Sequence, residues 1–163
     1  MASGDTLLIF TPFHNEPPSS NFATLGMRNG HPILQFDTTT SWSAVFSAIM
    51  PQNYANTTGV TVYIGSTLAS ATSGTLGYLV SFERMDGATD LDADSFAGTT
   101  TLTAATVPGT SGFPFLQSIA VTKGANMDSV VAGDGFRLKI ARDVANDTAA
   151  GNSEIVFVEI RET

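Results

Sequence analysis

The chain has 163 residues and a mass of 17.0 kDa, with 42% hydrophobic residues, 13% charged residues and a formal charge of −8. This length suits one hydrophobic core, so we expect residues 1–163 to form a single domain. The hydrophobic content excludes a disordered chain, and the low charged content disfavours a helical enzyme, whose exposed faces need Glu, Lys and Arg. Threonine, serine and glycine supply the polar positions instead, which favours an all-β fold.

The charge pattern also limits the partners that we expect. The seven basic residues are scattered, and phosphate backbones would repel such an acidic protein, so we expect no binding to nucleic acid. The absence of cysteine excludes disulfides, thiolate catalysis and cysteine-bound zinc. No run approaches the roughly 18 apolar residues of a membrane helix, and the first ten residues lack the features of an export signal. We therefore expect a soluble protein with no membrane partner.

The first predicted strand covers residues 7–10 and leads into a loop that contains Pro17 and Pro18. Neither proline can donate a hydrogen bond to a sheet, so the segment is predicted to be a loop or an extended arm. Because residues 7–13 are apolar, we expect residues 1–18 to be able to act as an N-terminal arm on a neighbouring subunit. The residues expected to make this contact are Leu7, Ile9, Phe10, Phe13, Pro17 and Pro18.

Short apolar stretches alternate with turn residues along the rest of the chain, at the spacing of about 8–12 residues that is typical of sandwiches and barrels. Strands are predicted over residues 32–36, 42–50, 60–64, 76–82, 99–107, 116–122, 136–140 and 155–160, with one short helical turn within 126–131. Residues 60–64 and 76–82 are predicted to be neighbouring antiparallel strands. This number of strands predicts a two-sheet β-sandwich, most simply a jelly roll.

Alternation within three of these strands predicts which side chains point into the core, because successive side chains of a strand point to opposite faces. The predicted inward residues are Val60, Val62, Ile64, Tyr78, Val80, Phe82, Phe136, Leu138 and Ile140.

The segment 86–94 holds the one concentrated run of charge, and its aspartates could in principle converge on a calcium ion. The EF-hand pattern fails, because Ser95 stands where that loop needs glycine and Thr101 stands where it needs glutamate. We expect an exposed acidic loop without a basic neighbour that binds divalent ions weakly or not at all, and we predict no metal site.

No enzymatic motif is present in the sequence. His14 and His31 lack a companion nucleophile or third metal ligand at a recognisable spacing, so both are expected to be hydrogen-bonded loop residues. Carboxylate pairs such as Asp128 with Asp134 could serve a glycosidase, but no pair is singled out. We expect a protein that is not an enzyme and that uses no cofactor.

A carbohydrate-binding module is one alternative. It would require Trp42, Tyr54, Tyr63 and Tyr78 to share an exposed face on which sugar rings could stack. Trp42 on its own is more simply a core residue, because small residues flank it on a predicted strand.

Several segments resemble a family of small, mostly uncharacterised virion proteins encoded by tailed bacteriophages and prophages. They are residues 13–18 (FHNEPP), 21–25 (NFATL), 28–32 (RNGHP), 92–96 (DADSF), 136–143 (FRLKIARD) with 146–148 (NDT), and 159–163 (EIRET). The resemblance runs nearly end to end. It implies a structural component of a virion, and it supplies no catalytic or binding residues.

The leading hypothesis is therefore a capsid decoration, or cement, protein made in the host cytoplasm and carried on the capsid exterior. It would associate with itself, as a homotrimer, and clamp the major capsid protein. Binding only to the assembled shell would stabilise that shell by mass action. The alternatives are a tail or fibre component and a carbohydrate-binding β-sandwich.

Overall fold

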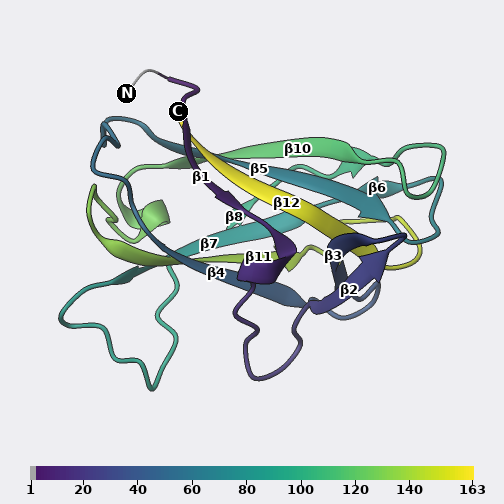
Figure 1. Cartoon of the computed structure of the whole chain (residues 1–163), viewed down its shortest axis with the longest axis horizontal. Helices are drawn as coiled ribbons and strands as arrows, with labels where there is room; N and C mark the ends of the chain where they lie inside the picture. The colour runs from purple at the N-terminus through teal and green to yellow at the C-terminus, as the bar shows by residue number, and fades with distance from the viewer. Residues whose placement is uncertain (1–2) are drawn as a thin grey trace.

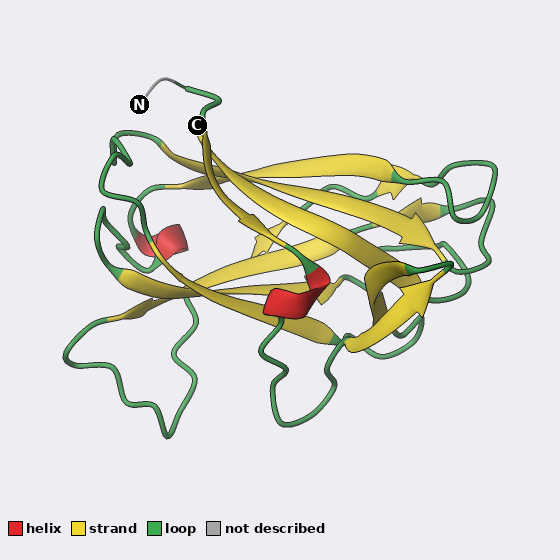
Figure 2. Ribbon diagram, in the orientation of Figure 1, coloured by secondary structure: helices red, strands yellow, loops and turns green. Residues whose placement is uncertain are grey.

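The computed structural model describes residues 3–163, and its regular secondary structure is almost entirely strand, joined by loops (Figure 2). Two short 3-10 helices, η1 (Pro12–His14) and η2 (Ala125–Met127), interrupt the strands. The strands are β1 (Thr6–Phe10), β2 (Thr24–Arg28), β3 (His31–Phe36), β4 (Ser43–Ile49), β5 (Gly59–Leu68), β6 (Thr75–Leu76), β7 (Tyr78–Met85), β8 (Thr100–Thr101), β9 (Ala105–Thr106), β10 (Phe115–Thr122), β11 (Gly135–Arg142) and β12 (Ser153–Glu162). No helix in this part of the chain is long and apolar enough to cross a membrane.

Two antiparallel sheets face each other across the core (Figure 1). The larger sheet has the order β10-β5-β12-β3-β2, with β1 also paired to β12. The smaller sheet has the order β4-β11-β7-β8, and β6 pairs with β9 at one end of the sandwich. The expected all-β, two-sheet β-sandwich is confirmed.

The core is filled by alternate side chains from both sheets. All nine residues that the alternation placed inward are fully buried, which confirms that prediction. Aromatic rings join the layers: the centroids of Phe10 and Phe46 lie 5.2 Å apart, and those of Phe36 and Tyr78 lie 5.9 Å apart. Because these rings carry much of the buried area, they contribute strongly to stability.

The prediction that residues 60–64 and 76–82 are neighbouring strands is wrong. They belong to β5 and β7, which lie in different sheets. The two strands face each other across the core, where Ser66 Oγ lies 3.2 Å from the hydroxyl of Tyr78. Alternation reports which side chains point inward, and it carries no information about which strand is the neighbour.

The predicted strand over residues 99–107 is also wrong as a single element. The segment contains β8, which pairs with β7, and β9, which pairs with β6. Between them Leu102 is buried and donates its backbone N–H to the carbonyl of Tyr78 at 2.8 Å. The threonine-rich segment therefore crosses from one sheet to another. The burial of Leu102 at this crossing separates β8 from β9.

The N-terminal strand lies in the chain's own large sheet. β1 pairs with β12 from Thr6 to Phe10, and Phe10 is buried against Phe46. Ile9 and Phe13 are exposed, by 61% and 65%. Of the other residues expected in an arm, Leu7 and Pro18 are half-buried and Pro17 is exposed. Contact of this segment with a neighbouring subunit stays a prediction.

Candidate functional site

A cleft of 460 Å³ lies on the outer face of the large sheet. Ile33 and Thr67 point into it, because they alternate with the core residues Leu34 and Leu68. We call it the Phe157 cleft. Its lining residues are Arg28, Asn29, His31, Ile33, Thr67, Gly112, Pro114, Val156 and Phe157.

A β-bulge places the aromatic ring of Phe157 in this cleft. The register of β12 against β5 shifts between Ile155, which pairs with Ser66, and Phe157, which pairs with Gly65. The extra residue turns Phe157 to the outer face, where it is 38% exposed. Any side chain at Gly65 would overlap this ring, so the glycine provides the space in which the ring lies.

The polar side of the cleft is held by Arg28. Its Nη1 donates to Glu154 Oε2 at 2.7 Å and to the carbonyl of Leu68 at 3.0 Å. The Arg28 side chain is 33% exposed, whereas that of Glu154 is only 4% exposed. Gly112 lies against the guanidinium, and a Cβ there would be 2.7 Å from Nη2. The arginine is thus fixed before any ligand arrives.

The β2–β3 turn presents two further polar side chains to the cleft. Asn29 and Gly30 have φ angles of +46° and +81°, the left-handed pair that a tight two-residue hairpin requires. His31 follows directly, with Nδ1 3.2 Å from the carbonyl oxygen of Arg28. The short turn therefore fixes the positions of Asn29 and His31 beside Arg28.

The floor of the cleft contains a hydroxyl that has no hydrogen-bond partner. Thr67 is 3% exposed, and its Oγ1 is buried and unpaired among residues 3–163. An unsatisfied buried polar group costs about 1–3 kcal/mol.

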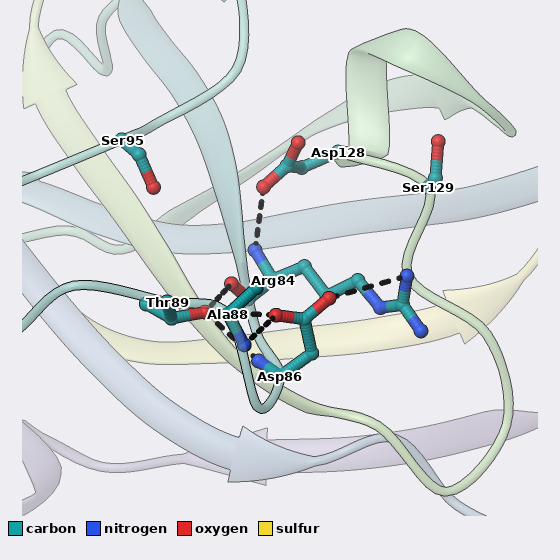
Figure 3. Close-up of a pocket in the computed structure, with 7 residues that line it drawn as sticks. All are labelled: Arg84, Asp86, Ala88, Thr89, Ser95, Asp128 and Ser129. Carbon is teal, nitrogen blue, oxygen red and sulfur yellow. Dashed lines mark hydrogen bonds and ion pairs between the residues drawn. The ribbon is translucent and has the colours of Figure 1, made fainter.

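A second hollow, of 350 Å³, gathers two of the predicted acidic residues (Figure 3). Asp128 Oδ2 accepts the backbone N–H of Arg84 at 2.8 Å, and Asp86 Oδ1 accepts that of Ala88 at 2.8 Å. Arg84 also forms an ion pair with Asp134 at 2.7 Å. Asp86 thus holds its own loop and Asp128 ties the end of η2 to β7, and no group of three metal-binding side chains occurs within the described residues.

The acidic segment 86–94 is largely exposed, as expected, but it does have basic neighbours. Arg84 lies 3.6 Å from Asp86, and Arg137 lies 2.7 Å from Asp94. Arg137 comes from β11, which is distant in sequence but pairs with β7. Sheet pairing therefore brings Arg137 to Asp94. The expectation of an acidic loop without a basic neighbour is wrong.

The four aromatic residues named from the sequence do not share an exposed face. Tyr54 and Tyr78 are buried, and Trp42 packs half-buried against the core. Tyr63 lies beneath the guanidinium of Arg161, 4.2 Å from its ring centroid. The exposed aromatic side chain of the cleft is Phe157, which sequence reasoning missed. The sequence feature that could have indicated the outward position of Phe157 is the run of four apolar residues at 155–158, which breaks the alternation of β12.

The histidines have structural partners, and Asp128 and Asp134 both contact Arg84. His14 Nδ1 accepts the backbone N–H of Thr11 at 2.9 Å, and His31 lies at the cleft. Asp134 accepts the N–H of Val131 at 2.9 Å, and this bond, with Arg84, lowers the pKa of Asp134. Each of these groups has a local structural partner.

No protein-family model and no curated protein sequence match the chain. Several solved structures resemble it in fold. A family 35 carbohydrate-binding module from Clostridium thermocellum is 8% identical, with a TM-score of 0.56 and coverage of 98% of this chain and 100% of that one. CBM35 from Cellvibrio japonicus Abf62 is 12% identical, with a TM-score of 0.52 and coverage of 95% and 92%. The CBM22-1 xylan-binding domain from Paenibacillus barcinonensis Xyn10C is 13% identical, with a TM-score of 0.51 and coverage of 99% and 96%. The chain therefore has the β-sandwich fold found in carbohydrate-binding modules.

Proposed function

We propose that this protein is a non-catalytic binding module whose ligand is a neutral carbohydrate held in the Phe157 cleft. The observation that carries the proposal is an exposed aromatic ring set beside fixed hydrogen-bonding side chains in one hollow of the sheet. The likeness in fold to carbohydrate-binding modules supports it.

The lining of the cleft matches the two-sided chemistry of a sugar ring. A pyranose has an apolar face of C–H groups and a rim of hydroxyls. Phe157, Ile33 and Pro114 supply an apolar surface, and Arg28 and Asn29 supply hydrogen-bonding groups at its border. Because Arg28 is already fixed by Glu154, little side-chain entropy is lost when a ligand binds.

The charge of the cleft favours a neutral ligand. Glu154 balances the positive charge of Arg28, and no acidic residue is among those that line the cleft. Glycoside hydrolysis uses two carboxyl groups roughly 5–9.5 Å apart across the scissile bond. The lining offers none, so we expect binding without cleavage.

A panel of neutral polysaccharides in affinity electrophoresis tests the proposal. We expect at least one to retard the protein, and we expect Phe157→Ala to remove the retardation. Phe13→Ala is the matched control, because Phe13 is an exposed phenylalanine on η1 outside the cleft. Failure of every neutral glycan to retard the wild type, or equal loss in both variants, would contradict the proposal.

A virion decoration protein is the second candidate, favoured by the sequence resemblance and by the exposed apolar side chains of Ile9 and Phe13. It would form a homotrimer and contact the major capsid protein. Removal of residues 1–18 would take Phe10 from the core, so the better variant is Ile9→Ser combined with Phe13→Ser. Decoration predicts many copies of the wild type per purified particle and fewer of the double variant; equal occupancy would contradict a clamping role.

A further inference from the structure

The protein covers both edges of its small sheet with its own chain. Along β4, the backbone N–H of Glu16 donates to the carbonyl of Val45 at 2.7 Å, and the N–H of Ala23 donates to that of Ser43 at 2.8 Å. Along β7, β8 pairs with the strand, and the N–H of Ala97 donates to the carbonyl of Phe82 at 2.7 Å. Such covering prevents a sheet edge from pairing with another chain.

The edge formed by β10 is different. β10 pairs with β5 through all eight residues without a bulge (Figure 1). None of the backbone hydrogen bonds that loops make within residues 3–163 involves Phe115–Thr122. Its sequence, FLQSIAVT, contains no charged residue, proline or glycine. It therefore lacks the charge, the proline and the bulge that usually protect an edge strand, and a long regular edge of this kind is competent for pairing.

The charge distribution indicates what can approach this edge. The chain carries a formal charge of −8, so two copies repel each other over most of their surfaces. Residues 95–122 contain no charged residue, and the first one after β10 is Lys123. The β10 edge is thus a surface where two copies can meet without bringing acidic groups together.

We propose that β10 pairs antiparallel with β10 of a second copy, about a two-fold axis at Ser118, and so joins two large sheets into one. Side chains directly opposite each other in an antiparallel pair point to the same face. An axis at Ser118 satisfies this requirement and sets Leu116, which is 54% exposed, opposite the partner's Ala120. The lysines at position 123 then lie at opposite ends of the pair. This inference is independent of the carbohydrate proposal.

Cysteine crosslinking tests the axis directly, because the natural chain has no cysteine. Opposite Cα atoms of an antiparallel pair are about 4.5–5.5 Å apart, which is within the range of a disulfide. We expect light scattering to give the mass of a dimer, and we expect Ser118→Cys to crosslink on mild oxidation. Thr122→Cys is the matched control, since Thr122 is exposed on the same face of β10 but away from the axis.

A charge variant gives an independent readout. Ser118→Lys would place two lysines against each other at the axis and raise the dimer dissociation constant about fivefold, with an unchanged far-ultraviolet spectrum. Three results would overturn the proposal: a monomer at all concentrations, a trimer mass, or equal crosslinking at positions 118 and 122.

Discussion

Two buried carboxylates of this molecule pair with arginines, and the two arginines differ in how many of their side-chain nitrogens donate to other groups of the protein. Arg142 is fully buried, pairs with Asp147, and donates to the carbonyls of Asp37, Ala149 and Gly151. Arg28 is one-third exposed, and its bonds to Glu154 and to a backbone carbonyl both come from Nη1. All three nitrogens of Arg142 are used to fix the loop that leads into β12. Arg28 also lines the Phe157 cleft, and its Nε and Nη2 make no hydrogen bond within residues 3–163, so they can serve a ligand.

The largest expected effect comes from breaking the buried pair. Arg142→Met removes donors from three carbonyls and leaves Asp147 as an uncompensated charge, so we expect a loss of about 3–5 kcal/mol in the free energy of unfolding. Denaturant titration followed by tryptophan fluorescence measures it. A loss below about 1 kcal/mol, the range of an exposed ion pair, would contradict the structural role of Arg142.

Arg28→Met should cost less stability and more function. It leaves Glu154 buried without its partner, so we expect a loss of about 1–3 kcal/mol by the same titration. Carbohydrate binding should be lost at temperatures where the variant remains folded. If binding is retained, Arg28 has no part in ligand recognition, and the contrast with Arg142 fails.

Gly65→Ala tests the other side of the cleft. The new methyl group overlaps the Phe157 ring, which must move, and overpacking of this kind costs about 1–3 kcal/mol. Because the ring is partly exposed and can swing outward, we expect the lower part of this range together with weakened carbohydrate binding. Gly87→Ala, at a glycine with open space around it, is the control and should change neither quantity.

The smallest expected effect is the loss of stability at low pH. Hydrogen bonds from Val131 and Arg84 hold the pKa of Asp134 below its ordinary value of 3.8, and Arg161 with Thr6 holds the pKa of Glu159 below 4.5. Both carboxylates therefore stabilise the fold above these values, and that stabilisation is lost as the pH falls through their folded-state pKa values. We expect the melting temperature to fall as the pH drops below about 4, and less steeply in Asp134→Asn. An identical slope of melting temperature against pH in that variant would show that Asp134 does not contribute to the acid dependence.

The sequence was sufficient to predict the class of fold and the inward positions of three strands, because alternation reflects burial directly. It could not predict strand neighbours, since β5 and β7 have similar alternation but belong to opposite sheets. Nor could it distinguish Arg142 from the other scattered basic residues. Its burial depends on the loop at 146–152 folding back over it, which the local sequence does not specify.

The cleft was harder to predict for a related reason. Phe157 faces outward only because one extra residue shifts the register of β12, and that residue is visible in the sequence only as an unbroken apolar run. Gly65, Arg28 and Phe157 are far apart in the chain and meet through sheet pairing. The tyrosines offered the more obvious aromatic signal, but two of them fill the core.

The most direct test of the account is a backbone amide chemical-shift titration of the ¹⁵N-labelled protein with a neutral oligosaccharide chosen from the polysaccharide that retards it most. We expect saturable shifts concentrated in the amides of residues 28–31, 33, 112–113 and 156–157, with β10 and the loop at 86–94 unaffected. Shifts centred elsewhere, or no saturable shifts at all, would contradict the assignment of the Phe157 cleft as a carbohydrate site.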